Sequence, residues 1–238
     1  VEEIATLPGK ASLGVYALDG DEPRSIVTSN PTEQLAIGST FKLYVLSSLA
    51  REIKAGKRQW SDVVQLDAPS IPSGQMQNWP IGAPVTLQTL ATMMISISDN
   101  IATDVLMRAL GREAVEAEVI ASGHANPSAT LPLLTTVEFF ALKTDPARVA
   151  AYKAADDARQ RGLLSQWGAS LTADKVDVSK FIGSGPTAID SIEWFASAKD
   201  VARIYKRLLD MGDPTVMAIL GINTALPPAE AEHWGYVG

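Results

Sequence analysis

The chain has no cysteine and only two histidines, His124 and His233, among its 238 residues. The absence of cysteine excludes disulfides, thiol catalysis and cysteine-based metal sites. Two histidines leave little material for a Ser-His-Asp triad or a histidine-rich metal centre. We therefore expect neither a metal nor a cofactor, and we look for chemistry among serine, lysine and carboxylate side chains.

Long apolar runs are also missing. No stretch approaches the ~18 consecutive apolar residues that a membrane-spanning helix requires. The formal net charge is −7, so the chain lacks the basic footprint of a nucleic-acid-binding protein. A hydrophobic content of 46% argues against disorder and is enough to bury a large core. These features predict a globular protein of one domain or two intimate lobes, without a nucleic-acid partner or a membrane span.

The chain does contain one hairpin signal, followed by mostly helical patterns. Ala11–Leu18 and Arg24–Thr28 are predicted strands, joined by the acidic turn Asp19-Gly20-Asp21. An isolated hairpin is marginally stable, so we expect further strands to cover it. Apolar spacing and capping residues predict helices at Val1–Pro8, from Ser39, at Val85–Ile97 and Ile101–Leu110, and from Asp145-Pro146, Ser197-x-x-Asp200 and Asp213-Pro214. Lys175–Ser191 is predicted to be a long surface loop.

Two short motifs carry candidate chemistry: Ser39-Thr40-Phe41-Lys42, a Ser-x-x-Lys, and Ser98-Asp99-Asn100. Residues three apart on a helix share a face, so Ser39 and Lys42 would be neighbours at a helix N-terminus. A serine hydroxyl needs a base, and a lysine can serve only if burial or nearby positive charge lowers its pKa. Ser-x-x-Lys alone is weak, since about one match is expected by chance in such a chain. A purely structural reading, with Ser39 and Asp99-Asn100 as helix caps, stays open.

The two motifs, with the stretches Pro72–Pro80 and Met94–Asp104, resemble the serine penicillin-recognising enzymes, the class A β-lactamases and penicillin-binding proteins. The resemblance implies an α/β (α+β) fold of the β-lactamase/DD-peptidase type, with an antiparallel sheet flanked by helices plus an all-helical lobe. Residues 1–33 would form the N-terminal helix and hairpin of the α/β lobe. Residues 34–215 would form the helical lobe that carries both motifs, and residues 216–238 would return to the α/β lobe.

The resemblance also implies roles for individual residues. Ser39 would be the acylated nucleophile, Lys42 its base and Ser98 a proton relay to the leaving group. Asn100 would bind a substrate amide, and Trp79 would either line the cleft or anchor its own loop. Substrates would be β-lactams, D-alanyl peptides of the peptidoglycan type, or small esters and amides, met in the periplasm or after secretion. The alternatives are a penicillin-recognising sensor that acylates without turnover, and an interaction domain with a dead site.

The sequence departs from the class A β-lactamases in the loop that should supply a deacylating glutamate. The matching stretch, residues 122–137, contains no carboxylate, and its only titratable side chain is His124. Glu138 follows directly, but Thr135-x-x-Glu138 predicts a helix-capping box. Glu113, Glu116 and Glu118 are predicted to form a solvated helix face. We therefore expect slow deacylation, with Glu138 and His124 as the two remaining candidate bases.

The third motif of this family, Lys-[Ser/Thr]-Gly on a C-terminal strand, does not occur in the 238 residues. His233–Val237 is predicted to begin another strand. We therefore expect a missing C-terminal segment, or a second chain, to complete the sheet and to provide a cationic group for a substrate carboxylate.

Overall fold

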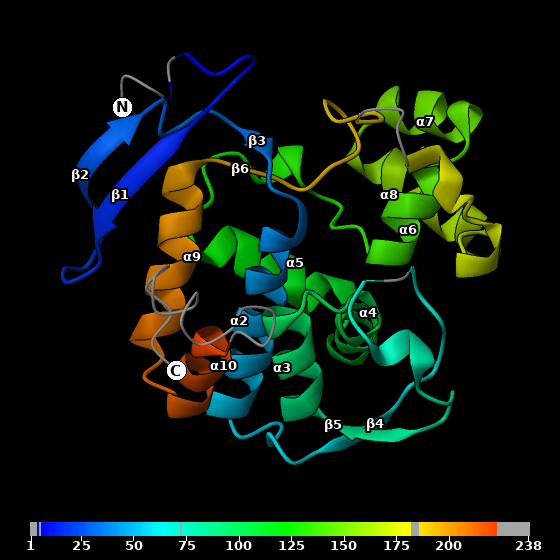
Figure 1. The fold of residues 1–238 in the computed structure, drawn as a ribbon, viewed down its shortest axis with the longest axis horizontal. Coiled ribbons are helices and arrows are strands. Elements are labelled where there is room, and N and C mark those ends of the chain that lie inside the picture. Colours follow the sequence, from blue (N-terminus) through cyan, green and yellow to red (C-terminus); the bar gives the residue numbers. More distant parts are fainter. Residues whose placement is uncertain (1–3, 5, 72, 182–185, 223–238) are drawn as a thin grey trace.

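The computed structural model describes residue 4 and the ranges 6–71, 73–181 and 186–222, in which a hairpin leads into a mainly helical body (Figure 1). The strands are β1 (Leu13–Ala17), β2 (Arg24–Ser29), β3 (Leu35–Ala36), β4 (Val63–Gln65), β5 (Pro84–Thr86) and β6 (Phe195–Ala196). The helices are α2 (Lys42–Lys54), α3 (Leu87–Ser96), α4 (Asn100–Leu110), α5 (Arg112–Ala121), α6 (Thr136–Lys143), α7 (Pro146–Lys153), α8 (Asp157–Trp167), α9 (Ala198–Asp210) and α10 (Pro214–Gly221). No helix in the described ranges is long and apolar enough to cross a membrane.

The described strands pair as three two-stranded antiparallel sheets, β1–β2, β3–β6 and β4–β5. The predicted hairpin is confirmed, with Val15 opposite Val27. The pair β3–β6 joins segments that are far apart in sequence, and it continues in a hydrogen bond from Ile37 N to Trp194 O (2.8 Å). This pairing fixes the backbone immediately before the Ser-x-x-Lys motif.

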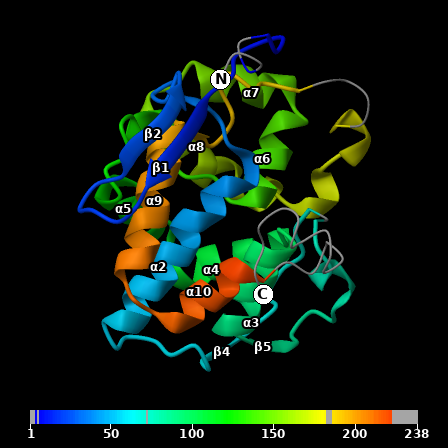
Figure 2. The ribbon, with the colours of Figure 1, turned by 60° about the vertical axis from the view of Figure 1, so that its left-hand side comes forward.

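Helix α2 runs through the middle of the helical body, in contact with α3, α4, α5 and α9 (Figure 2). Its first nine residues, Lys42–Ala50, are all buried. A helix surrounded on every side by others loses its solvent face, which explains why the apolar positions of α2 are not confined to one stripe. The lysine of the Ser-x-x-Lys motif therefore starts a core helix.

A column of three aromatic rings supports the start of α2. Phe41 stacks on Trp194 with ring centroids 4.0 Å apart, and Trp194 stacks on Phe139 at 4.3 Å. The Trp194 indole N–H donates to Leu134 O (3.0 Å), so the ring keeps its polar atom satisfied while buried. Stacked aromatic pairs add about 0.5–1.5 kcal/mol beyond their area burial, and here they join α2 and α6 to the segment before β6.

Two predicted helices differ from the structure in their extent. The segment Val85–Ile97 begins as strand β5, and helix α3 starts only at Leu87, because the Thr86 side chain caps it by accepting from Thr89 N (3.1 Å). The long helix expected from Asp145-Pro146 is divided into α7 and α8. A second N-cap, Asp156, accepts from Arg159 N (2.9 Å) and starts α8 in a new direction.

The prediction of a solvated acidic face on α5 is wrong for two of its three glutamates. Glu113 is exposed, whereas Glu116 and Glu118 are buried. Their charges are compensated by arginines from other elements, Arg161 on α8 for Glu116 and Arg51 and Arg207 for Glu118. Helical spacing cannot reveal partners that arrive from elsewhere in the chain.

Several predictions lie wholly or partly outside the described residues. These are the helix over Val1–Pro8, residues 182–185 of the loop Lys175–Ser191, and the strand start at His233–Val237. The loop begins with 3-10 turns at Ala173–Lys175 and Val178–Phe181. The division into segments 1–33, 34–215 and 216–238 stays a prediction.

Candidate active site

Ser39 lies in a 3-10 turn, Gly38–Phe41, that leads directly into α2. The predicted helix start at Ser39 is early by one turn, because α2 begins at Lys42, whose N–H donates to the carbonyls of Ser39 and Thr40. The Ser39 side chain is exposed, and its hydroxyl makes no hydrogen bond within the described part of the chain. Its oxygen is thus open to solvent and free to accept a new partner.

Lys42 is the centre of the site, with only 2% of its surface exposed. Its Nζ donates to Ser98 O (2.7 Å), Ser98 Oγ (3.0 Å) and Asn100 Oδ1 (2.9 Å). A lysine ammonium has three donors, and all three are used here. The structure therefore brings Lys42, Ser98 and Asn100 together, from two motifs that are distant in sequence.

Burial lowers the pKa of Lys42 to about 8, because the ammonium loses its hydration. The negative charges of Asp104 and Asp99 act in the opposite direction and limit the fall. With a pKa near 8, Lys42 is a neutral amine in about one tenth of the protein molecules at pH 7. A lysine can act as a base only if its pKa is lowered, and here the loss of hydration lowers it.

Ser98 holds a backbone conformation that a side chain rarely adopts, with φ of +57°. This conformation turns both its carbonyl and its hydroxyl toward Lys42. The carbonyl also accepts from Ser73 Oγ (2.9 Å). Left-handed backbone at a non-glycine residue costs about 1–3 kcal/mol and is retained where the surroundings enforce it, often at functional sites.

Asp99 clamps the neighbouring loop onto the Ser-Asp-Asn motif. Its carboxylate accepts from Ala102 N (3.0 Å) and so caps the N-terminus of α4, the local role that the sequence indicated. The same carboxylate also accepts from Gln75 N and Met76 N in the loop (both 2.8 Å). Gly74 lies against it with φ of +91°, and a Cβ there would overlap the Asp99 carboxylate. The long-range part of this clamp was not predicted, although a glycine within Pro72–Pro80 was its available signal.

Trp79 follows the clamped loop, directly after the 3-10 turn Met76–Asn78. Its side chain is 39% exposed. Its backbone N–H donates to Met76 O (3.0 Å), which ties the tryptophan to the residue held by Asp99. The cleft-lining role of Trp79 stays a prediction.

A second buried carboxylate, Asp104, lies one helical turn beyond Asn100 and was missed by the sequence analysis. It accepts from Ser70 Oγ (2.6 Å), Thr136 N (2.7 Å), Thr136 Oγ1 (2.8 Å) and Val137 N (3.1 Å). Burial raises the pKa of the Asp104 carboxyl despite these bonds. Asp104 thus fastens the start of α6 to the helix that carries Asn100.

Glu138, one candidate for the deacylating base, is fully engaged elsewhere. Its carboxylate accepts from Thr135 N (2.8 Å) in the predicted capping box, which is confirmed. Its other oxygen accepts from Arg112 Nη2 (2.6 Å). These bonds hold Glu138 to its own helix start and to α5.

His124, the other candidate, is buried and uses both ring nitrogens. Nδ1 accepts from Asn126 N (3.1 Å), so the proton lies on Nε2, which donates to Phe195 O (2.9 Å). A histidine with both nitrogens bonded to backbone serves structure. In the described ranges no group of three or more His, Asp or Glu side chains is placed to hold a metal ion.

The exposed serine, the desolvated lysine and the Ser-Asp-Asn turn belong to the two motifs on which the resemblance to β-lactamases and penicillin-binding proteins rests. The chain belongs to the beta-lactamase enzyme family, whose model matches residues 1–212. Solved structures agree in fold. A beta-lactamase from Sphaerobacter thermophilus has 20% identity and a TM-score of 0.51 over 81% of this chain and 56% of its own.

Two further solved structures are similar. Penicillin-Binding Protein D2 from Listeria monocytogenes, in its cefotaxime-bound form, has 14% identity and a TM-score of 0.56 over 94% of this chain and 72% of its own. The D-alanyl-D-alanine carboxypeptidase DacD from Francisella tularensis has 16% identity and a TM-score of 0.51 over 88% of this chain and 41% of its own. The chain thus spans only part of the length of these proteins. A search of curated proteins found no match.

Proposed function

We propose that this protein is a serine hydrolase that forms an acyl-enzyme on Ser39 with β-lactams, D-alanyl peptides or small esters and amides. The observation that carries the proposal is the buried Lys42, bonded to Ser98 and Asn100 one turn away from an exposed serine hydroxyl. A solvated lysine would be protonated and inert, whereas a desolvated one has a useful fraction of free base at neutral pH.

The acylation step follows from these groups. The Ser39 oxygen bonds to the substrate carbonyl carbon, and the hydroxyl proton passes to the neutral Lys42 amine. The carbonyl–nitrogen or carbonyl–oxygen bond of the substrate then breaks. The leaving atom takes the proton of Ser98, which Lys42 replaces. Ser98 Oγ suits this relay because a hydroxyl both donates and accepts, so its bond to Lys42 can reverse when the amine loses its proton.

Asn100 serves Lys42 and the substrate together. Its Oδ1 accepts from Lys42 Nζ, and one Nδ2 proton is donated to Ile71 O (3.3 Å). An amide NH₂ has a second proton, which is left for a substrate carbonyl. The bond to Lys42 also fixes which end of the amide faces the site, since only the oxygen can accept from an ammonium.

Deacylation is proposed to be slow. Glu138 is bound by Arg112 and by its capping box, and His124 donates and accepts through backbone bonds. Neither is free to activate a water molecule. The acyl-enzyme should therefore outlive that of an enzyme with a dedicated carboxylate base, which also keeps the sensor alternative open.

The test is intact-mass measurement of the protein after exposure to a fluorescent penicillin and to a panel of esters. We expect one adduct, mapped to the peptide with Ser39, that is absent in Ser39→Ala and present in the matched variant Ser128→Ala, which alters another exposed serine. An adduct on another peptide contradicts the proposal. A stoichiometric burst with a plateau favours the sensor, sustained turnover favours the enzyme, and no labelling favours the dead domain.

We further propose that the protein works in the periplasm or after secretion. A cationic Lys-x-Gly motif and further strands are proposed to come from sequence after Gly238 or from a second chain. The support is the absence of that motif from the 238 residues and the pairing of β1 with a single described strand. Intact mass of the natural protein, compared with 25.3 kDa, tests this.

A further inference from the structure

A cavity of about 530 Å³ lies at the opposite end of α2 from Ser39. Its walls are the hairpin turn at Asp21–Pro23, the end of α2, the end of α5 and the second half of α9. The cavity shares no residue with the Lys42 site. Arg51 is nine residues after Lys42, which places it about 14 Å further along the axis of α2.

The cavity is lined by an excess of positive charge. Five cationic side chains line it: Arg51, Lys54, Arg203, Lys206 and Arg207. Three carboxylates also line it: Asp21, Glu22 and Asp210. Five against three leaves two positive charges in excess in the lining itself, but two buried carboxylates behind it offset them: Glu118 pairs with Arg51 and Arg207, and Asp200 pairs with Arg203. The donors left for an anion are therefore the terminal nitrogens of Arg51 and the remaining protons of Lys54.

The floor of the cavity holds two arginines in fixed positions. The buried Glu118 carboxylate pairs with Arg51 Nε (2.5 Å) and Arg207 Nε (2.7 Å), and it accepts from Ser47 Oγ (2.8 Å). One carboxylate balances one guanidinium, so the pair keeps a positive charge. The two terminal nitrogens of Arg51 make no hydrogen bond within the described residues. They are donors in a fork that matches carboxylate or phosphate oxygens.

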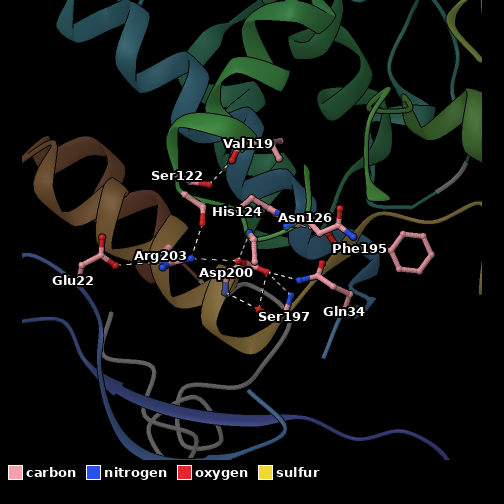
Figure 3. A network of polar contacts seen from close by, with 12 residues as sticks. Glu22, Gln34, Val119, Ser122, His124, Asn126, Phe195, Ser197, Asp200 and Arg203 are labelled. Atoms are coloured by element: carbon pink, nitrogen blue, oxygen red, sulfur yellow. Dashed lines mark hydrogen bonds and ion pairs between the residues drawn. The ribbon is translucent and has the colours of Figure 1, made fainter. Parts of the chain in front are cut away.

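The wall beside the hairpin is also held in place. Figure 3 shows Arg203 reaching Glu22 on one side and the Asp200 network on the other. Its Nη1 donates to Gly123 O (2.6 Å). Across the cavity, Lys54 Nζ donates to Met211 O (3.0 Å) and has two further protons. A site whose cations are positioned before binding loses less entropy when it takes up a ligand.

Helix dipoles explain part of this pattern. Arg51 and Lys54 lie in the last turn of α2 and Arg207 in the last turn of α9, where cations are favoured. The dipoles do not account for Arg203, which lies a turn earlier on α9. They also do not explain why the cations of α2 and α9 converge on one hollow, where the terminal nitrogens of Arg51 make no hydrogen bond within the described residues.

We propose that this cavity binds a small molecule through a phosphate or carboxylate group, with Arg51, Lys54 and Arg207 as its main contacts. The proposal is independent of catalysis at Ser39. The test is isothermal titration of the whole chain with inorganic phosphate and, separately, with succinate, at constant ionic strength set by sodium chloride. We expect saturable binding of one equivalent, and the tighter of the two probes identifies the recognised group.

The deciding variant is Lys54→Gln, and its matched control is Lys10→Gln, which removes a lysine from the N-terminal segment. We expect Lys54→Gln to weaken binding about tenfold and Lys10→Gln to leave it within about twofold. Thermal unfolding without ligand checks that both variants are folded. On the unmodified protein, sulfate should displace phosphate. The absence of saturable binding, failure of sulfate to compete, or equal weakening by both variants would overturn the proposal.

Discussion

The Nζ atom of Lys42 lies 2.7 Å from the carbonyl oxygen of Ser98 and 3.0 Å from its hydroxyl oxygen, so one residue in a left-handed conformation binds the lysine twice. The carbonyl can only accept, and it therefore anchors the side chain in either protonation state. The hydroxyl can reverse its bond as the lysine loses its proton. The carbonyl oxygen therefore fixes the position of the lysine, and the hydroxyl oxygen allows a proton to move between Ser98 and Lys42.

The first prediction concerns pH. Because burial lowers the pKa of Lys42 to about 8, the rate of acylation should rise about tenfold from pH 6.5 to 7.5 and level off above pH 9. Stopped-flow labelling with a chromogenic β-lactam across this range measures it. Unfolded lysine titrates near 10.5, so the unfolded chain binds more protons between these values. Lys42 should thus make the protein more stable as pH rises from about 8 to 10.5. A rate that does not vary between pH 6.5 and 9 would rule out Lys42 as the base.

The second prediction concerns Asp104, whose negative charge raises the pKa of Lys42. Asp104→Asn keeps an oxygen acceptor but removes the charge, so the midpoint of the acylation profile should move to lower pH. The protein should also lose about 1–3 kcal/mol of stability, because the buried bonds to Ser70, Thr136 and Val137 are altered. The pH–rate profile and urea unfolding measure the two effects.

The control for this prediction is Asp67→Asn, which removes a half-exposed carboxylate paired with Arg108. It should leave the midpoint in place. If both variants shifted the midpoint equally, the effect would be one of net charge and Asp104 would have no special position.

The third prediction concerns Gly74 and the loop held by Asp99. In Gly74→Ala the new Cβ would meet the Asp99 carboxylate, so the loop must move and the bonds from Gln75 N and Met76 N must lengthen. We expect a loss of about 2–4 kcal/mol in unfolding free energy and slower acylation, since Asp99 and Ser98 are adjacent.

Gly82→Ala provides a closely matched comparison. Gly82 has a similar φ of +85°, but nothing lies within 4 Å of its would-be Cβ. It should cost only about 1 kcal/mol of conformational strain and leave acylation unchanged. Equal losses of stability in the two variants would show that the contact with Asp99 is unimportant.

The fourth prediction concerns Glu118, between Arg51 and Arg207. Glu118→Ala leaves these two partly buried guanidiniums without their shared carboxylate and should cost about 3–5 kcal/mol. Glu113→Ala, on the same helix but exposed, should change stability by less than about 0.5 kcal/mol. Chemical denaturation of both variants makes the comparison, and similar values would mean that Glu118 is as solvated as the sequence alone predicted.

The local sequence predicted those parts of the site that depend on neighbours in the chain. Helical spacing predicted that Ser39 and Lys42 are neighbours, and the capping box at Thr135 and Glu138 was predicted from its own four residues. Only the family resemblance linked Ser39 and Lys42 to the distant Ser98 and Asn100. The bonds from Lys42 confirm that the two motifs meet.

The contacts that could not be predicted join segments without a common pattern. Asp104 binds Ser70, which precedes it by 34 residues, and Thr136, which follows it by 32 residues. No sequence pattern around any of these three residues indicates that they are in contact. Glu118 was assigned to solvent because its two arginines belong to α2 and α9. Buried polar groups of this kind depend on tertiary structure, which single-sequence periodicity does not contain.

The stack of Phe41 on Trp194 has a consequence for biosynthesis. The ribosome produces both motifs of the proposed active site long before it reaches Trp194, yet Phe41 in the turn with Ser39 stacks on that ring, and Ile37 just before the turn bonds to its backbone. A nascent chain therefore carries Ser39 on an unsupported turn until the later segment emerges, because a contact between distant segments cannot form before both exist. If Ser39 is the acylated residue as proposed, labelling by a β-lactam should begin only after this late contact forms. Incomplete chains that end before Ile192 should then escape labelling although they contain Ser39, Lys42, Ser98 and Asn100.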